Sequence, residues 1–247
     1  MSANFTVPAR FGQPIKSAPQ QIASAIKESI VDGTLAPGTR LPTEQELTEL
    51  FGVSRPTLRE ALKELRAAQV LIAERGRNGG YRVAEFSPRS LAATVGEFVS
   101  LSIAARTTTY RQLFEVRLAL EVLAAQSAAR NRTDADLERL EAALPRPDVD
   151  SFEKLLRDDI GFHRAVADAS HNPLIIAYIG ASSIAFQRFS GLEESYSEGI
   201  VAHLDEVFAG VRDRDADRAG QAMDVHLRYF ADFYGTADRE HGAPPAR

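Results

Sequence analysis

The stretch TEQELTELFGVSRPTLREALKELRA, residues 43–67, predicts two short helices joined by a tight turn. Thr43 and Glu46, three residues apart, have the spacing of a capping box at the start of the first helix. Gly52 accepts at no steric cost the positive φ that a tight turn requires. Ser54 is the expected N-cap of the second helix, and a proline follows in its first turn, where a missing N–H does no harm.

The second helix of this pair combines an apolar seam with a cationic stripe. Its apolar residues are spaced i, i+3, i+4 and i+7, which indicates one buried face; they are Leu58, Ala61, Leu62 and Leu65. The neighbouring stripe carries Arg55, Arg59, Lys63 and Arg66. Such a helix behind a glycine turn is typical of the recognition helix of a helix-turn-helix motif. The alternative is an ordinary helical hairpin with a solvated basic face.

A further helix and a β-hairpin complete this N-terminal unit. Isoleucines four residues apart predict a first helix over residues 19–31. Residues 70–75 and 81–84 are short apolar-containing runs on either side of a glycine-rich loop, the pattern of a hairpin. Three helices followed by a hairpin predict a winged helix-turn-helix. The tip of this wing is basic through Arg75 and Arg77 and suited to phosphate contacts, although a hairpin that merely caps the helices is the alternative.

Composition and charge distribution fit a small DNA-contacting module on a larger body. The 247-residue chain is 44% hydrophobic and 26% charged, as expected of a soluble globular protein. Its net charge is −5, but residues 1–86 hold 11 Lys+Arg and 9 Asp+Glu, giving +2, whereas residues 87–247 hold 18 and 25, giving −7. The chain has no cysteine, and neither a membrane span nor a signal peptide is indicated, so the expected location is the cytoplasm.

The run GTLAPGTRLPTEQELTELFGVSRPTLREALKELRAAQVL, followed by GRNGGYRV, resembles the DNA-binding domain of GntR-type bacterial transcription regulators over about residues 19–84. The resemblance implies that the start of the recognition helix and the wing contact a double-stranded DNA operator. It carries over to Arg55, Thr57, Arg59, Arg75 and Gly76. Gln45 stands where many relatives have an arginine, so it offers hydrogen bonds without charge. The predicted DNA-binding set also includes Arg40, Ser54, Lys63 and Arg77.

The rest of the chain is expected to form an all-helical bundle, so the predicted fold is mainly α. The predicted domains are a flexible arm (1–18), a winged helix-turn-helix (19–86), an all-helical ligand-binding and dimerisation domain (87–236) and a disordered tail (237–247). The expected helices of the third domain, separated by turn or cap residues, span about 88–105, 108–131, 134–144, 151–169, 173–191, 194–212 and 215–235.

Polar residues fall on the apolar faces of four of these helices. Asp159 and His163 are four residues apart in the middle of one apolar stripe, so their side chains are neighbours. A carboxylate that faces a core without a partner costs several kcal/mol, so Asp159 is expected to have one. Arg117, His203 and His226 fall on the inward faces of three other helices.

One carboxylate and three imidazoles inside a bundle are the usual composition of a divalent-metal site. The predicted ligands are Asp159, His163, His203 and His226, with Zn²⁺ as the first expectation and Ni²⁺ or Mn²⁺ as alternatives. The other interpretation of each histidine taken alone is a hydrogen-bonded core residue. His171, in a turn, and His241, in the tail, are expected on the surface.

The segments VRLALEVLAAQSAA, DDIGFHRAVADASHNPL and HLDEVFAGVRDRDADRAGQAMDVHL resemble the FCD effector domain of the FadR-like subfamily of GntR regulators, over about residues 90–235. The resemblance implies that the aspartate and three histidines bind a divalent metal, that a small organic acid completes the coordination, and that Arg117 pairs with the carboxylate of this effector. The expected protein is a homodimeric, metabolite-responsive regulator of transcription that binds a pseudo-palindromic operator and no membrane. Repression is the first expectation and activation stays open.

Two other interpretations of the polar cluster remain. A metal-dependent enzyme fused to a DNA-binding module is one, since an open coordination position can activate water. No carboxylate at motif spacing presents itself as a general base, although Glu121 is inward and near Arg117. The other interpretation is a structural metal that only stabilises the bundle.

Overall fold

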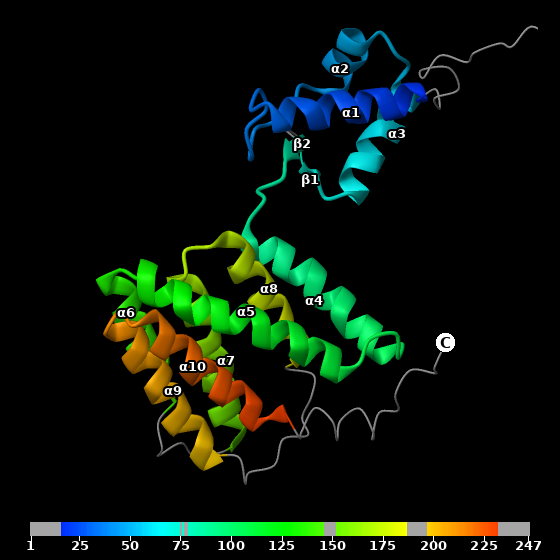
Figure 1. Cartoon of the computed structure of the whole chain (residues 1–247). Helices are drawn as coiled ribbons and strands as arrows, with labels where there is room; N and C mark the ends of the chain where they lie inside the picture. The colour runs from blue at the N-terminus through cyan, green and yellow to red at the C-terminus, as the bar shows by residue number, and fades with distance from the viewer. Residues whose placement is uncertain (1–15, 75, 77–78, 146–151, 187–196, 232–247) are drawn as a thin grey trace, which may run out of the picture. The chain divides into compact units, whose positions relative to one another are not determined.

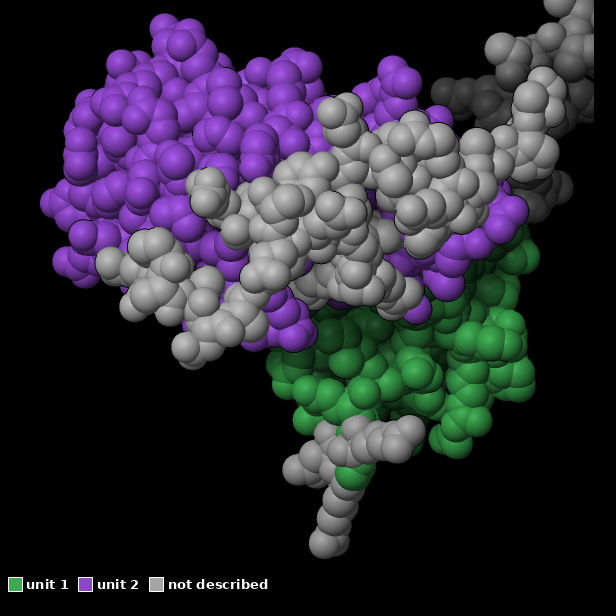
Figure 2. Space-filling view, turned by 90° about the horizontal axis from the view of Figure 1, so that it is seen from below, with its two compact units in different colours: residues 1–86 green, residues 87–247 purple. Residues whose placement is uncertain are grey.

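The computed structural model describes residues 16–74, 76, 79–145, 152–186 and 197–231. The chain divides into two compact units, residues 1–86 and residues 87–247, which are drawn in different colours in Figure 2.

The first unit is a three-helix fold with a two-stranded wing (Figure 1). Its elements are α1 (Ala18–Val31), α2 (Glu44–Phe51), α3 (Arg55–Ala67), β1 (Leu71–Glu74) and β2 (Gly80–Val83). The strands pair antiparallel, with Leu71 opposite Val83 and Glu74 opposite Gly80. The predicted winged helix-turn-helix is confirmed.

The predicted caps set the helix-turn-helix geometry. Thr43 Oγ1 accepts a hydrogen bond from the Glu46 amide at 3.3 Å, and Glu46 Oε2 accepts one from the Thr43 amide at 2.7 Å. Gly52 ends α2 with a left-handed φ of 62°, a conformation that favours glycine. The seam of α3 is fully buried at Leu58, Ala61, Leu62 and Leu65, so this helix is held against the core while its polar face points outward.

The second unit contains seven helices within its described residues (Figure 1). They are α4 (Pro88–Ala104), α5 (Tyr110–Asn131), α6 (Asp134–Ala143), α7 (Phe152–Ala169), α8 (Pro173–Phe186), α9 (Ser197–Arg212) and α10 (Ala216–Tyr229). Thr109 caps α5, which therefore begins two residues after its predicted start. Phe230 is the C-cap of α10, and residues 232–235 of the last predicted helix lie outside the described residues. None of the described helices is long and apolar enough to span a bilayer.

Helices α4 and α8 approach each other through small residues. A Cβ added to Gly96 on α4 would lie 2.9 Å from Ile184 Cβ and 3.0 Å from the Ala181 carbonyl oxygen. A Cβ added to Gly180 on α8 would lie 3.0 Å from Ala92 Cβ. The two backbones are therefore too close for larger side chains in this contact.

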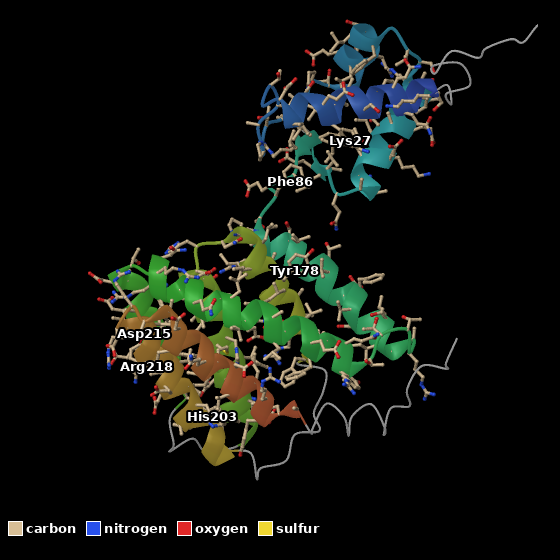
Figure 3. All side chains as sticks on the ribbon, viewed as in Figure 1. Lys27, Phe86, Tyr178, His203, Asp215 and Arg218 are labelled. Atoms are coloured by element: carbon tan, nitrogen blue, oxygen red, sulfur yellow. The ribbon has the colours of Figure 1, made fainter. Side chains whose placement is uncertain are left out.

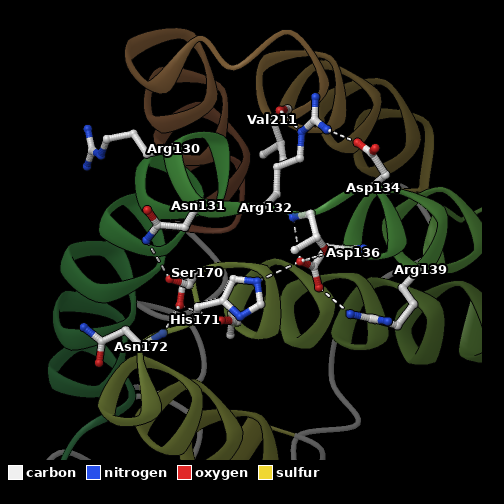
Figure 4. A network of polar contacts seen from close by, with 12 residues as sticks. Arg130, Asn131, Arg132, Asp134, Asp136, Arg139, Ser170, His171, Asn172 and Val211 are labelled. Carbon is white, nitrogen blue, oxygen red and sulfur yellow. Dashed lines mark hydrogen bonds and ion pairs between the residues drawn. The ribbon is translucent and has the colours of Figure 1, made fainter.

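A polar network joins the turns at one end of the second unit (Figure 4). Asp136 at the start of α6 is buried and accepts hydrogen bonds from the amide and hydroxyl of Thr133. It also contacts His171 Nε2 at 2.8 Å, in the turn before α8, and forms an ion pair with Arg139. Burial alone would raise the pKa of Asp136, but these partners hold it well below its ordinary value. The sequence patterns did not single out this aspartate.

Candidate metal centre and DNA-binding surface

Three predicted ligands bring one atom each to a common point inside the second unit. His163 Nε2 on α7 lies 3.0 Å from His226 Nε2 on α10. Asp159 Oδ1, one turn before His163, lies 3.3 Å from His226 Nε2 and 3.7 Å from His163 Nε2. All three side chains are almost completely buried.

The spacing and chemistry of these atoms fit a divalent metal ion. Two ligand atoms that are each about 2.1 Å from one ion are about 3.0–3.4 Å apart at octahedral or tetrahedral angles. Asp159 Oδ1 is buried with no hydrogen-bond partner among the described residues, which is costly for a carboxylate unless a cation compensates it. One carboxylate oxygen and two imidazole nitrogens are a donor set that Zn²⁺, Ni²⁺ and Mn²⁺ accept.

Glu121 on α5 supports this cluster from behind. Its Oε2 contacts His163 Nδ1, the ring nitrogen opposite the one that faces the common point. Its Oε1 accepts a 2.6 Å hydrogen bond from Arg117 Nε. A carboxylate on the second nitrogen of a ligating histidine fixes its tautomer and orientation. Sequence periodicity placed Glu121 inward near Arg117, and it was considered there as a general base. The i, i+4 spacing to Arg117 can be seen in the sequence, whereas the contact with His163 cannot.

The buried charges in the cluster stabilise one another. Burial would lower the pKa of His163, but the carboxylates of Glu121 and Asp159 outweigh it and raise this pKa to about 9. Burial would raise the pKa of Glu121, but the nearby Arg117 and His163 lower it to about 2. The pKa of Asp159 is likewise held well below its ordinary value, against burial, by His163 and His226. Both carboxylates are therefore charged at neutral pH, and a metal ion that binds between Asp159 and His163 has to displace the proton that His163 carries without it.

His203, the fourth predicted ligand, is not one of the three convergent residues. Figure 3 labels it on α9. Its ring centroid is 6.1 Å from that of His226 and 5.1 Å from that of Tyr229. Its Nδ1 is buried without a hydrogen-bond partner among the described residues. Partial burial lowers the pKa of His203 and so favours the neutral ring that a metal ligand requires.

Arg117 points inward from α5, as predicted, with only 6% of its surface exposed. Its guanidinium carbon lies 4.8 Å from the centre of the Phe186 ring on α8. Together with the hydrogen bond to Glu121, this contact holds the positive charge of Arg117 next to the carboxylate that orients His163.

The predicted DNA-contacting residues of α3 lie on its outward face. Arg55, Arg59 and Lys63 are exposed, and Thr57 is partly exposed. Arg59 Nε forms an ion pair of 2.9 Å with Glu44 of α2. Ser54 caps α3 by accepting a 3.4 Å hydrogen bond from the Thr57 amide, and its hydroxyl also forms a 2.8 Å hydrogen bond with the Thr57 hydroxyl. This face is cationic and free of large apolar side chains.

The remaining predicted contacts lie around the wing and on α2. Arg40 donates a 2.8 Å hydrogen bond to the Gly79 carbonyl and so ties the loop before α2 to the wing. Gly76 has a φ of 117°, which favours glycine at the wing tip. Gln45 is engaged with Glu49 at 3.2 Å. Arg75 and Arg77 lie outside the described residues.

Comparison with known proteins assigns both units. The family described as "Bacterial regulatory proteins, gntR family" matches residues 18–80, and the FCD domain matches residues 112–229. The putative L-lactate dehydrogenase operon regulatory protein of Escherichia coli (strain K12) is 31% identical over 234 residues, covering 85% of this chain and 83% of the relative. The galactonate operon transcriptional repressor of the same strain is 31% identical over 216 residues, covering 82% and 90%.

Two further matches agree with these. The HTH-type transcriptional regulator LutR of Bacillus subtilis (strain 168) is 37% identical over 151 residues, which cover 59% of this chain and 65% of that protein. Among solved structures, a Streptococcus agalactiae GntR protein has the same fold, with a TM-score of 0.61 and 24% identity over 87% of this chain and 99% of that one.

The two units therefore define a bacterial transcription regulator that joins a DNA-reading winged helix to a helical effector domain. The chain belongs to the GntR family and carries an FCD domain, as in the FadR-like subfamily. Its relatives are transcription regulators and not enzymes, which agrees with the predicted regulator and argues against the enzyme alternative.

Proposed function

We propose that this regulator senses a small hydroxycarboxylic acid at a divalent-metal site in its FCD domain. The observation that carries the proposal is the convergence of Asp159, His163 and His226, with Arg117 buried close by. His203 is the proposed fourth ligand. The printed names of two relatives refer to operons of L-lactate dehydrogenase and of galactonate, and lactate and galactonate are both hydroxy acids.

In the proposed site, the metal ion and Arg117 bind different oxygen atoms of the effector. A bound Zn²⁺, Ni²⁺ or Mn²⁺ ion supplies a Lewis acid for carboxylate and hydroxyl oxygens. Arg117 offers a second, fixed positive charge to an effector carboxylate, in the planar geometry that suits this group. Glu121 holds both Arg117 and His163 in place, so the arginine and the metal ligand act as one preorganised site.

Effector binding acts on DNA through a change in the relative stability of two arrangements of a homodimer. In the proposed dimer, two copies of α3 read successive half-sites of a pseudo-palindromic operator. The site draws residues from α5, α7 and α10, so a ligand that favours one packing of these helices favours one arrangement of the dimer. We expect the effector to release the operator, so that the protein represses transcription when no effector is bound.

Metal binding is tested with a pair of neighbouring aspartates. Asp159→Asn removes the proposed ligand, whereas Asp158→Asn changes a partly exposed residue that pairs with Lys154 on the same helix. We expect elemental analysis to find about one metal ion per chain in the wild type and in Asp158→Asn, and far less in Asp159→Asn. Equal metal content in all three proteins would refute the metal site.

Effector recognition is tested by thermal unfolding. Hydroxy acids and matched acids without the hydroxyl are compared, with and without a chelator. A ligand at 100 times its dissociation constant adds about 2.7 kcal/mol of stability, which gives a clear shift in Tm. We expect the shift to need both the metal and Arg117, and to disappear in Arg117→Gln. If Arg117→Gln keeps the full shift, the arginine does not bind the effector; if no acid shifts Tm, the metal is structural.

Operator contact is tested by gel shift. Arg59→Ala on the recognition helix is expected to abolish operator binding while leaving the effector-induced Tm shift intact. Lys27→Ala is the control, because Lys27 (labelled in Figure 3) is a partly exposed base on α1 outside the predicted contact set. It pairs with Glu64. Equal affinity of Arg59→Ala and wild type for the operator would refute the assignment of α3 as the recognition helix.

A further inference from the structure

Helices α9 and α10 come close together beside His203, the proposed fourth ligand. A Cβ added to Gly199 on α9 would lie 2.5 Å from Tyr229 Cζ and 2.9 Å from Tyr229 Oη. Atoms that are not bonded do not approach one another so closely, so the phenol ring of Tyr229 packs directly on the backbone of α9. The place that Tyr229 occupies therefore requires a glycine at position 199.

The same tyrosine ring also contacts His203. Gly199 and His203 are four residues apart on α9, so they lie on one face of this helix. The rings of Tyr229 and His203 meet edge to face, with centroids 5.1 Å apart and planes at 79°. On α10, Tyr229 follows His226 by three residues and shares its face. The contact between the two helices thus joins the glycine, the tyrosine and two of the proposed ligands.

The separations of the imidazole rings show how far His203 is from the position of a ligand. Two imidazoles whose nitrogens are each about 2.1 Å from one ion have ring centres about 4.5–5.2 Å apart at octahedral or tetrahedral angles. The rings of His163 and His226 are 5.0 Å apart and meet this condition. Those of His203 and His226 are 6.1 Å apart, which is about 1 Å too far. A small rotation of the His203 side chain covers such a distance.

We propose that Tyr229 positions His203 as the fourth metal ligand. The inference rests on the metal site of the proposed function and adds a residue that does not touch the metal. His203 is only partly buried, so its side chain can turn towards solvent unless a neighbour restricts it. The tyrosine ring, held against Gly199, provides this restriction. A ligand that is kept near its bound position loses less conformational freedom when the ion binds.

The role of the ring is tested by its effect on zinc affinity. Tyr229→Leu removes the aromatic ring, and Tyr229→Phe keeps it. We expect competition titration of Zn²⁺ against a chelating dye to give a dissociation constant raised about 10-fold in Tyr229→Leu and within about twofold of the wild type in Tyr229→Phe. Circular dichroism checks that both variants are folded. Wild-type affinity in Tyr229→Leu, or an equal loss in both variants, would overturn the proposal.

A double-mutant cycle tests whether the tyrosine acts through His203. In His203→Ala the three convergent ligands remain, but Tyr229 has no fourth ligand to orient. We expect Tyr229→Leu to change the zinc affinity of His203→Ala by less than about twofold, although it lowers that of the wild type about 10-fold. An equal loss in both backgrounds would mean that the tyrosine only stabilises the unit, and the positioning role would be wrong.

A pair of helical glycines gives an independent test. Gly199→Ala places a methyl group where the tyrosine ring lies, whereas Gly161→Ala adds one on α7 where it meets no neighbouring side chain among the described residues. We expect Gly199→Ala to weaken zinc binding as Tyr229→Leu does, and Gly161→Ala to bind zinc like the wild type. Wild-type affinity in Gly199→Ala would contradict the proposed seat of the tyrosine.

The outcomes separate this inference from the metal site itself. A wild-type protein that binds no zinc at micromolar concentration would contradict the proposed metal site, and the role of Tyr229 with it. A wild-type protein that binds zinc, loses affinity in His203→Ala and keeps it in Tyr229→Leu would contradict the role of Tyr229 alone.

Discussion

Replacing Glu121 by glutamine should weaken metal binding strongly, although the residue contacts no metal in the proposed site. In the wild type the two oxygens of Glu121 face two N–H donors, Arg117 Nε and His163 Nδ1. Glutamine has one oxygen and one NH₂ group in the same shape. Whichever way the amide is turned, one N–H donor therefore faces an NH₂ group.

The expected magnitude follows from this mismatch. If the NH₂ group faces His163, the ring gains by presenting the Nδ1 lone pair to it, and the proton then occupies Nε2, where the metal would bind. A charge-assisted hydrogen bond is worth about 1.5–3 kcal/mol, and its loss in a buried site corresponds to about 10- to 100-fold in metal affinity. Both side chains are only 1% exposed, so water cannot replace the lost acceptor.

The assay is a competition titration of the metal against a chelating dye, at constant pH. Glu115→Gln is the matched control, because it makes the same change on α5 at a side chain that is 62% exposed and paired only with Arg111 among the contacts described for it. We expect the control to bind the metal within about twofold of the wild type. If Glu121→Gln binds as tightly as Glu115→Gln, the role given to the carboxylate is wrong.

Three further outcomes are expected from the packing. Asp136→Asn should lower the free energy of unfolding by about 2–3 kcal/mol at pH 7 in urea titrations, because the buried network loses its charge. Since the folded pKa of Asp136 is depressed, its contribution is fully present above the unfolded pKa of about 4 and is lost progressively as the pH falls from there towards the folded pKa, so the difference between mutant and wild type should begin to shrink below about pH 4. Leu62→Ala, at a fully buried position, should cost about 2–5 kcal/mol. Gly96→Ala should cost about 1–3 kcal/mol and lower Tm, because the added Cβ meets the backbone and side chains of α8.

The first unit was predictable because its signals are local. The capping residues Thr43 and Ser54, the turn at Gly52 and the seam of α3 act within a few residues of one another, and the structure reproduces each of them. Short-range geometry of this kind is set by backbone sterics and by caps, which a single sequence displays directly.

The centre of the second unit was predictable only in part. Helical periodicity placed Asp159, His163 and His226 inward, and the structure brings them together. Periodicity gives the direction of a side chain but not its height along a neighbouring helix, so the offset of His203 could not be foreseen. The contact of Glu121 with His163 joins α5 to α7 and depends on the same unseen register.

Helix α8 contacts both Arg117, in the proposed effector site, and helix α4. Phe186 lies against Arg117, and Ile184, two residues earlier, packs closely against Gly96 of α4. A shift of Arg117 towards a bound acid therefore meets a helix that is braced at both places. We therefore expect α8 to pass a displacement of Arg117 on to α4. Gly96→Ala should consequently alter the effect of the effector on operator binding as well as the stability of the fold.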